Sequence, residues 1–407
     1  MNQQIGRREF LERVGMGAAG FVAGGYHANA AGLPANEAIY IGCIGTGGRC
    51  GYLAKSFKAI PGVRVAAICD VWDDNLERAK AYAEPSAQAT RRYQDVLDNK
   101  DIDAVLIATP DHLHVPITIA ACEAGKDVYV EKPLTHNREE GQSVIDAQRR
   151  TGRVVQVGMQ QRSMPHLAEA REIVRSGELG PIRKVHLTWN RNSGPTSKAT
   201  ISIPPEKVDW KAFLGNAKDQ PFDPYRFRNW RFFWDFGGGV FTDLMVHFID
   251  VAHWFLGFEN PATAVSIGNW FTRKDQWETP DTVQTLMQYQ EPEAQVYFEG
   301  TFYNARNAAM MEFMGSEATL YCDRGRYEIH PEYDRPIAYR ERVLGTGPRG
   351  QDYYDQPDAE LLHLNNWFEC IRSRGVPNAP VEAGVLAANA AHLANQALRE
   401  GIVARWG

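Results

Sequence analysis

Apolar segments and amphipathic segments alternate along the chain from residue 39 to residue 159. The apolar segments read as strands at 39–45, 63–70, 103–110, 127–133 and 154–159. The segments between them have helical periodicity, at 49–60, 75–83, 114–125 and 137–152. Strands that are apolar throughout are typical of a parallel sheet covered by helices on both faces. The alternation therefore predicts an α/β domain, and the length of 407 residues predicts a second domain after it.

A glycine-rich turn, Gly45 to Gly51, joins the first predicted strand to the first predicted helix. Gly45 permits the tight turn, and Gly47 lets the backbone approach a pyrophosphate that the helix N-terminus stabilises. Asp70 ends the second strand, where a carboxylate accepts hydrogen bonds from a ribose 2′-hydroxyl and repels a 2′-phosphate. The pattern predicts a site for NAD in preference to NADP, with a helix-capping role for Asp70 as the alternative. Cys50 replaces the motif's third glycine, which leaves the geometry of the turn open.

Lys132 lies in the sequence Glu131-Lys132-Pro133, which ends the fourth predicted strand. Open α/β sheets bind ligands at the carboxyl ends of their strands, and proline holds the residue before it extended. We therefore expect Lys132 at a ligand site. Further along, Asp243 and His247 are four residues apart on a predicted helix and share one face. No third metal ligand is apparent beside them, so the pattern does not predict a metal site.

Composition restricts the partners and the cysteine chemistry. The net charge of −6 argues against a nucleic-acid partner, which needs a basic face. After the N-terminal region, no run is apolar over the roughly 20 residues that span a bilayer. The six cysteines are scattered, and Cys43 and Cys69 fall in predicted buried strands. We expect free buried thiols rather than a disulfide framework.

The first 30 residues resemble a twin-arginine export signal. Arg7 and Arg8 are adjacent, an uncharged run extends over 14–25, and Ala28-Asn29-Ala30 offers a site for signal peptidase. We expect export to the periplasm by the route that carries folded proteins, with a mature chain that starts near Ala31. An amphipathic N-terminal helix is the alternative.

Four motifs in order resemble the Gfo/Idh/MocA family of sugar and polyol dehydrogenases, which includes glucose-fructose oxidoreductase and inositol dehydrogenase. They are the glycine turn at 45–51, ATPDHLH at 108–114, EKP at 131–133 and GGxxxDxxxH at 238–247. The resemblance implies a Rossmann domain over 31–160, after a signal peptide at 1–30. It also implies an α+β domain over 161–407 with a large, mostly antiparallel open sheet and C-terminal helices that pack back. Seven segments between 182 and 330 read as its strands, and a dimer or tetramer through this sheet is expected.

The resemblance also assigns roles to individual residues. His247 matches the general base of hydride transfer, Lys132 stabilises the developing alkoxide, and Asp243 orients or tunes His247. The residues expected at the cofactor are Gly45, Thr46, Gly47, Gly48, Arg49, Asp70, Thr109, Pro110, His114, Glu131, Lys132 and Gln160. For His114, a structural role in its loop is the alternative.

The segment 191–236 is rich in proline, arginine and aromatic residues and has weak periodicity. A long irregular segment in a compact domain is usually functional. Aromatic rings stack on sugar faces and arginines bind hydroxyls or carboxylates, so the segment suits a carbohydrate pocket. With two residues from outside it, the substrate candidates are Arg162, Arg191, Arg228, Trp230, Arg231, Trp234 and Tyr303. A packing role is the alternative for each of them.

Export and a dinucleotide site together favour a tightly bound cofactor, because the space outside the inner membrane has no free pool of dinucleotides. We therefore expect an oxidoreductase that acts on a sugar, polyol or glycoside carbinol. One alternative is a redox-neutral enzyme that cleaves glycosides by oxidation, elimination and re-reduction, which would need a further base near the C2 proton. The other is a non-catalytic sugar-binding protein, against which the joint presence of Lys132, Asp243 and His247 argues.

Overall fold

Six parallel strands form the first sheet of the computed structural model, which describes residues 38–193, 201–344 and 358–407. The predicted signal peptide lies outside these ranges. The strands are β1 (Ile39–Ile44), β2 (Val63–Cys69), β3 (Gln88–Thr90), β4 (Ala104–Ile107), β5 (Asp127–Val130) and β6 (Val155–Val157). Their order is β3-β2-β1-β4-β5-β6. The strand order reverses between β1 and β4, which makes this position the topological switch point of the sheet. Open α/β sheets bind ligands in the crevice at such a point.

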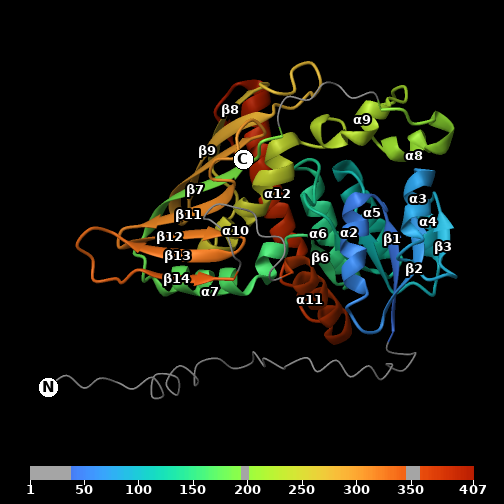
Figure 1. Ribbon diagram of the computed structural model, residues 1–407, viewed down its shortest axis with the longest axis horizontal. Coiled ribbons are helices and arrows are strands. Elements are labelled where there is room, and N and C mark those ends of the chain that lie inside the picture. The colour runs from blue at the N-terminus through green and yellow to red at the C-terminus, as the bar shows by residue number, and fades with distance from the viewer. Residues whose placement is uncertain (1–37, 194–200, 345–357) are drawn as a thin grey trace.

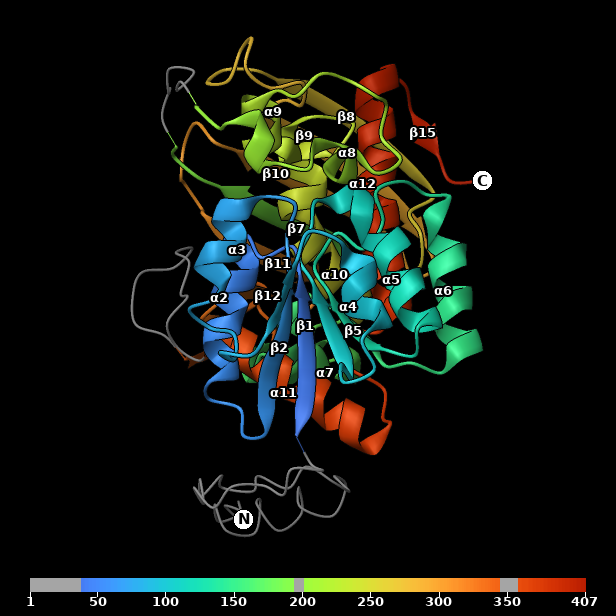
Figure 2. The same cartoon turned by 90° about the vertical axis from the view of Figure 1, so that its right-hand side faces the viewer.

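Helices cover both faces of this sheet. They are α2 (Gly48–Phe57), α3 (Asp73–Ala79), α4 (Tyr93–Asp98), α5 (His114–Glu123) and α6 (Glu140–Thr151). Figure 2 shows α2 and α3 on one side of the sheet and α5 and α6 on the other. Helix α11 (Ala359–Ser373), from far along the chain, packs beside α2, where the ring of Phe368 meets that of Phe57 edge-on at 5.9 Å. The first domain's core is therefore completed by the C-terminal part of the chain.

Nine strands form the second sheet, in the order β14-β13-β12-β11-β7-β10-β9-β8-β15. Neighbouring strands are antiparallel except for the parallel pair β7 and β10. The strands are β7 (Ile182–Asn190), β8 (Thr263–Asn269), β9 (Thr282–Gln290), β10 (Glu293–Thr301), β11 (Ala309–Gly315), β12 (Ala318–Asp323), β13 (Arg326–Pro331), β14 (Arg340–Val343) and β15 (Ala404–Arg405). The predicted fold, a Rossmann domain followed by a mostly antiparallel sheet, is confirmed.

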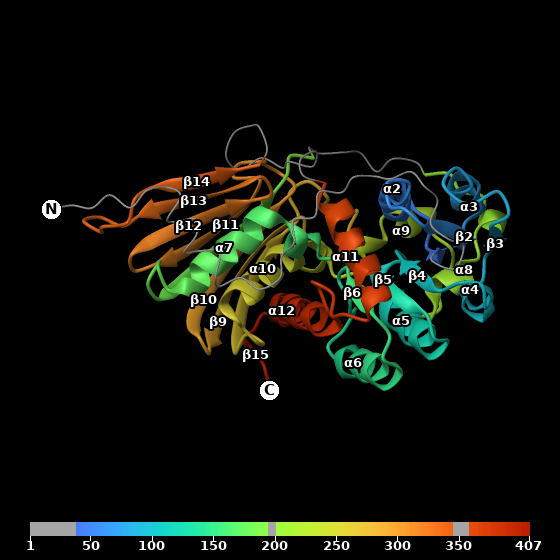
Figure 3. The same ribbon diagram turned by 90° about the horizontal axis from the view of Figure 1, so that it is seen from below.

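One face of the second sheet is covered by α7 (Pro165–Ser176), α10 (Val246–Leu256) and α12 (Val381–Glu400) (Figure 3). The alternation in β9 shows the two faces, because Val283 and Met287 are buried whereas Leu286 is exposed. Helix α12 also contacts α6 and β6 of the first domain. It therefore lies between the two sheets (Figure 1) and joins their cores.

The segment 201–236 lies over the carboxyl ends of the first sheet. It contains the short helices α8 (Trp210–Leu214) and α9 (Pro224–Arg228), which Figures 1 and 2 show close to α3. Its apolar side chains form a separate small core with Trp72, which follows β2. The segment thus connects the second half of the chain to the edge of the nucleotide domain.

Two further sequence predictions concern the cysteines and the membrane. All six cysteines are buried free thiols, as predicted. Within the described ranges, no helix is both long and apolar enough to cross a bilayer.

Candidate active site

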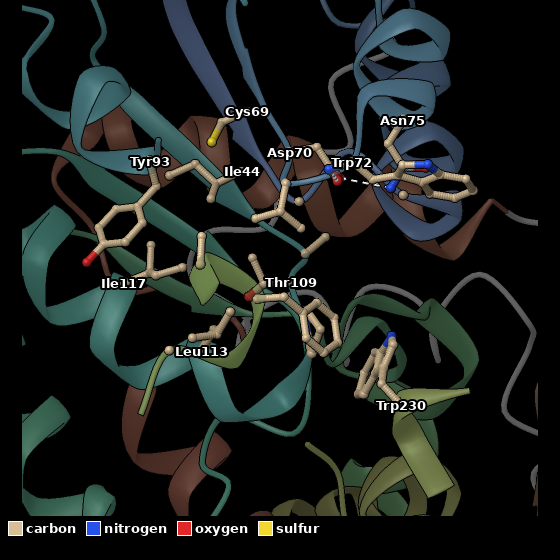
Figure 4. Close-up of a pocket in the computed structure, with 18 of the residues that line it drawn as sticks. Ile44, Cys69, Asp70, Trp72, Asn75, Tyr93, Thr109, Leu113, Ile117 and Trp230 are labelled. Atoms are coloured by element: carbon tan, nitrogen blue, oxygen red, sulfur yellow. Dashed lines mark hydrogen bonds between the residues drawn. The ribbon is translucent and has the colours of Figure 1, made fainter. Parts of the chain in front are cut away.

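A cavity of about 580 Å³ lies at the carboxyl ends of β1, β2 and β4. The glycine turn and Asp70 line one side of it, and Thr109 and Pro110 follow from the loop after β4. Residues of the segment 201–236 line it as well, namely Ala212, Phe213, Gly215, Asn216, Phe227, Arg228, Trp230 and Arg231. Figure 4 shows Asp70 and Asn75 on one side of the cavity and Trp230 on another. The cavity therefore lies between the nucleotide domain and this segment.

The glycine turn has the geometry that a dinucleotide requires. Gly45 has φ +81°, and a Cβ atom there would lie 2.7 Å from the backbone of Ala108 and Thr109. A Cβ atom on Gly48 would meet no protein atom within 4 Å, because the cavity lies above it. Helix α2 begins at Gly48, so its N-terminal amide groups face this open space. Cys50 is buried beside the Tyr82 hydroxyl, 3.5 Å away, and does not line the cavity.

Asp70 is held by several hydrogen bonds. Its carboxylate accepts from the backbone amide of Trp72 at 2.9 Å, from the Asn75 side chain at 3.0 Å and from the Thr46 hydroxyl at 3.4 Å. Burial outweighs these bonds and raises its pKa to about 6. Asp70 thus lines the cavity and also fixes the turn before α3. Thr46 was also expected at the cofactor; it is buried, does not line this cavity, and donates its hydroxyl to Asp70.

A second cavity, of about 280 Å³, adjoins the first. Arg49, Thr109, Trp230 and Arg231 line both cavities. Lys132, Asp243 and His247 all line the second one. The three residues predicted to be catalytic therefore meet next to the predicted cofactor site.

Lys132 and Asp243 form a close pair in this second cavity. The Nζ atom of Lys132 donates to Oδ1 of Asp243 at 3.0 Å and to its backbone carbonyl oxygen at 2.7 Å. Arg231 donates to the same Oδ1 at 3.2 Å. Burial alone would raise the pKa of Asp243, but the charges of Lys132 and Arg231 outweigh it and lower the pKa to about 2. Asp243 is therefore a carboxylate that holds two cations.

The expected contact between Asp243 and His247 is not observed. Asp243 lies in a π-helical turn, Phe241–Met245, that precedes α10, whereas His247 lies in α10 itself. The π turn interrupts the regular α-helical register that the prediction assumed between the two residues. The carboxylate faces Lys132 and Arg231 instead, which corrects the predicted role of Asp243.

His247 is buried against Trp189, whose ring stacks on the imidazole with 5.1 Å between centroids. Its Nδ1 atom has no hydrogen-bond partner among the described residues. Burial, followed by the charge of Lys132, lowers its pKa well below the ordinary value. The imidazole is therefore neutral at pH 7 and can accept a proton.

Arg49 lies where the two cavities meet. Its guanidinium donates to Glu131 at 2.7 Å and to Glu360 at 3.2 Å, and Gln160 also donates to Glu360, at 3.1 Å. Glu360 belongs to α11, so this cluster ties the glycine turn and the EKP sequence to the C-terminal part of the chain. Arg49, Glu131 and Gln160 line the second cavity as a bonded group.

His114 has the structural role in its loop that was the alternative to a place at the cofactor. It is buried, and its two ring nitrogens lie 2.7 Å from the carbonyl oxygen of Pro133 and 2.9 Å from that of Thr109. Burial lowers its pKa to about 4. The imidazole touches the second cavity but serves chiefly to join two loops.

Three of the seven substrate candidates line neither cavity. Arg162 forms a buried ion pair with Asp250 at 2.8 Å. Trp234 packs under the guanidinium of Arg399, and Tyr303 is 62% exposed beside Phe271. Arg162 is therefore a structural partner of α10, and the other two are packing or surface residues. The remaining four candidates line the cavities. The first cavity is lined by Arg228, Trp230 and Arg231, and the second by Arg191, Trp230 and Arg231.

Four polar or aromatic residues of the second cavity were not among the predicted site residues. Asp111, Trp189, Arg324 and Glu360 line the second cavity. Asp111 lies inside the ATPDHLH motif, so its position next to Pro110 was an available signal. Burial raises its pKa well above the ordinary range. The other three depend on the placement of distant elements, for which the sequence carries no spacing pattern.

The comparisons with known families agree with both domains. A family model described as "Oxidoreductase family, NAD-binding Rossmann fold" matches residues 39–159, and one described as "GFO/IDH/MocA C-terminal domain" matches residues 167–328. The chain belongs to the Gfo/Idh/MocA family. It is an oxidoreductase of this family with an NAD-binding Rossmann domain, and the open glycine turn and Asp70 fit that cofactor.

Two named dehydrogenases resemble this chain in sequence. The scyllo-inositol 2-dehydrogenase (NAD(+)) of Bacillus subtilis is 25% identical over 84% of this chain and 91% of that protein. Levoglucosan dehydrogenase of Pseudarthrobacter phenanthrenivorans is 31% identical, over 48% of this chain and 46% of the relative.

Solved structures share the same fold. A levoglucosan dehydrogenase complex with NADH and levoglucosan has a TM-score of 0.71 at 20% identity, covering 90% of this chain and 99% of that one. The aldose-aldose oxidoreductase from Caulobacter crescentus complexed with glycerol has a TM-score of 0.66 at 20% identity, covering 91% and 100%. At these identities the likeness concerns the fold alone.

Proposed function

We propose that this protein oxidises a hydroxyl group of a sugar or polyol by hydride transfer to NAD, keeps the dinucleotide bound between turnovers, and is exported by the twin-arginine route. The observation that carries the proposed reaction is the meeting of Lys132, Asp243 and His247 in a cavity that adjoins the glycine turn. The names of the inositol and levoglucosan dehydrogenases support a carbohydrate or polyol substrate.

The side chains suit the proton and charge movements of this reaction. When bound, NAD would supply the acceptor for the hydride of the carbinol carbon. The hydroxyl group loses its proton as the hydride leaves, and the neutral imidazole of His247 accepts that proton. Lys132 stabilises the negative charge that develops on the same oxygen. Asp243 keeps the ammonium of Lys132 in place, and Arg231 donates to the same carboxylate.

The segment 201–236 supports retention of the cofactor. It bonds to the nucleotide domain through the bridge between Trp72 and Val208, and through a hydrogen bond of 2.8 Å from Asp209 to the carbonyl oxygen of Val71. Lys207 pairs with Asp74 at 3.0 Å. Because this segment also lines the first cavity, we expect its contacts to slow the release of a bound dinucleotide.

The reaction is tested with protein loaded with NAD and a panel of sugars and polyols. We expect NADH formation with at least one of them, and His247→Ala should lose most turnover but keep the cofactor. Near-normal turnover in that variant would show that His247 is not the general base. A chromogenic glycoside is included, because release of its chromophore without net NADH would favour redox-neutral cleavage instead.

Retention is tested on protein purified without added nucleotide and then denatured. Release of stoichiometric NAD is expected, whereas NADP would overturn the role of Asp70 and no nucleotide would overturn retention. Lys207→Glu places a negative charge beside Asp74 and should speed NAD release by about threefold to tenfold. The matched change Lys218→Glu, at an exposed position of the same segment, should leave the release rate unchanged.

Export is tested with the double variant Arg7→Lys and Arg8→Lys. We expect the unchanged protein in the periplasmic fraction, with an N-terminus near Ala31, and the variant inside the cell. An intact Met1 on periplasmic protein would contradict the proposed signal peptide.

A further inference from the structure

The carboxyl group of Asp111 is buried in the wall of the second cavity. Asp111 begins a short 3-10 turn, Asp111–Leu113, that follows β4, and the residue is only 4% exposed. Its side chain forms no hydrogen bond and no ion pair with any other residue that the structure describes. A buried polar group without a partner costs free energy, so native proteins retain few of them. Asp111 therefore offers hydrogen-bonding capacity that these parts of the chain leave unused.

The loop around Asp111 is fixed on both sides. The Nε2 atom of His112 lies 2.8 Å from the carbonyl oxygen of Phe213. The ring of His114 joins two carbonyl oxygens, as described above. Because both histidines are bonded to other segments, the backbone holds Asp111 in place although nothing bonds its carboxyl group. A polar group that is already positioned loses little further freedom when it binds a ligand.

Asp111 lies on the side of the site where the proposed reaction takes place. It lines the second cavity but not the first, whereas Pro110 before it lines the first but not the second. Lys132 and His247 share the second cavity with it. The chain thus passes, within two residues, from the cavity of the glycine turn to the cavity of the catalytic candidates.

The size of the second cavity brings any sugar in it close to Asp111. Its volume of about 280 Å³ lies just below the usual range of ligand pockets, about 300–1,000 Å³. A single sugar ring that reaches Lys132 and His247 is therefore expected to contact most of the lining, Asp111 included. Of the charged groups around Asp111, Lys132 lowers its pKa most, which agrees with a short separation between the two.

A carboxyl group suits a hydroxyl group as its partner in either protonation state. A carboxylate accepts hydrogen bonds, and a carboxylic acid accepts on one oxygen and donates from the other. Burial raises the pKa of Asp111 well above its ordinary range, which favours the acid form. A sugar hydroxyl both donates and accepts, so it satisfies this form fully.

We propose that Asp111 binds a second hydroxyl group of the substrate, beside the hydroxyl group that meets Lys132 and His247. The substrate is then a diol rather than a simple alcohol, and Asp111 selects the position and orientation of the second hydroxyl. This inference rests on the proposed oxidation and adds a specificity-determining residue to it.

The test uses glucose, myo-inositol and their monodeoxy analogues, each of which lacks one hydroxyl group, on protein loaded with NAD. Besides the analogue that lacks the reacting hydroxyl, we expect one that loses about 10- to 100-fold in kcat/KM, because it leaves the buried carboxyl unpaired. In Asp111→Ala the parent compound should react no better than this analogue. Asp111→Asn, which keeps a donor and an acceptor, should retain part of the preference. Asp101→Ala, at an exposed position before the opposite end of β4, should leave the preference unchanged.

A binding measurement separates this inference from the proposed oxidation. The same compounds are titrated into the NAD-loaded protein in a calorimeter. If none is oxidised but Asp111→Ala abolishes a preference for a parent over one analogue, the oxidation fails and the role of Asp111 stands.

Two results would overturn the role of Asp111. One is a preference for the parent compounds that is the same in the unchanged protein and in folded Asp111→Ala or Asp111→Asn. The other is a weaker affinity for NAD in these variants with an unchanged preference among the sugars, which would place Asp111 at the cofactor instead.

Discussion

The ammonium of Lys132 and the carboxylate of Asp243 lie 3.0 Å apart, and the backbone carbonyl oxygen of Asp243 accepts a second hydrogen bond from the same ammonium. Asp243 thus fixes the cation that would stabilise an alkoxide, and it leaves His247 to act without a carboxylate partner. The pair connects the end of β5 with the turn before α10, so the catalytic geometry depends on how the two domains pack.

Lys132→Met is expected to lower kcat by roughly 10²- to 10³-fold, because it removes the charge that stabilises the developing alkoxide. The affinity for NAD should change far less, since the glycine turn and Asp70 are untouched. Steady-state kinetics and a titration followed by tryptophan fluorescence measure the two effects. Lys80→Met, at an exposed position, is the control. An unchanged kcat in the Lys132 variant would contradict the assignment.

Gly45→Ala and Gly48→Ala should separate folding from nucleotide binding. At Gly45 the new methyl group would lie 2.7 Å from backbone atoms at a φ of +81°, so we expect a loss of stability of about 1–3 kcal/mol together with weaker NAD binding. At Gly48 it would meet no protein atom within 4 Å, so stability should hold while NAD binding weakens. Urea unfolding and NAD titration check both. Equal stability of the two variants would rule out this explanation.

Arg162→Met is expected to destabilise the protein and to leave KM for the substrate nearly unchanged. The change leaves the fully buried carboxylate of Asp250 without its cation, which typically costs about 3–5 kcal/mol. The double change Arg162→Met with Asp250→Leu should recover much of the stability. A large rise in KM in a variant that remains folded would indicate that Arg162 binds the substrate.

Stability should fall as the pH is lowered from 7 to 5, in part through His166. Burial lowers the pKa of His166 to about 4, whereas the unfolded chain has the ordinary value near 6.5. Below pH 6.5 the imidazole is therefore protonated in the unfolded state. In the native state it stays neutral until the pH nears 4. The contribution of neutral His166 to the free energy of unfolding is fully present above pH 6.5. It decreases by about 1–2 kcal/mol by pH 5. His166→Gln should flatten the dependence of the urea midpoint on pH, and parallel curves would contradict it.

The regular elements could be predicted because their signals are local. The apolar runs around Ile41 and Val105 and the alternation from Thr282 to Gln290 specify strands without knowledge of the rest of the fold. The short strands β3, β14 and β15 were missed, because two to four residues are too few to show a period. Helix α4 was missed because its six residues make fewer than two helical turns.

The site could be predicted only where a motif marks it. Lys132 and His247 lie in recognisable motifs, and both line the same cavity. The partner of Asp243 could not be inferred, since it depends on a π turn in an otherwise helical pattern. The pairing of Arg162 with Asp250 joins residues 88 apart, and that of Arg49 with Glu360 joins residues 311 apart. Contacts over such separations are set by tertiary packing, not by local sequence.

The bond between Arg49 and Glu360 also constrains when the protein becomes competent to bind its nucleotide. Helix α11 supplies buried side chains to the core of the first domain, yet it is made 311 residues after Arg49. At about 5–20 residues per second, synthesis of that interval takes roughly 15–60 s. Throughout that time the growing chain exposes the apolar surface that Trp367 and Phe368 later cover. This part of the nucleotide domain's core is therefore completed late, although its strands are among the first to leave the ribosome.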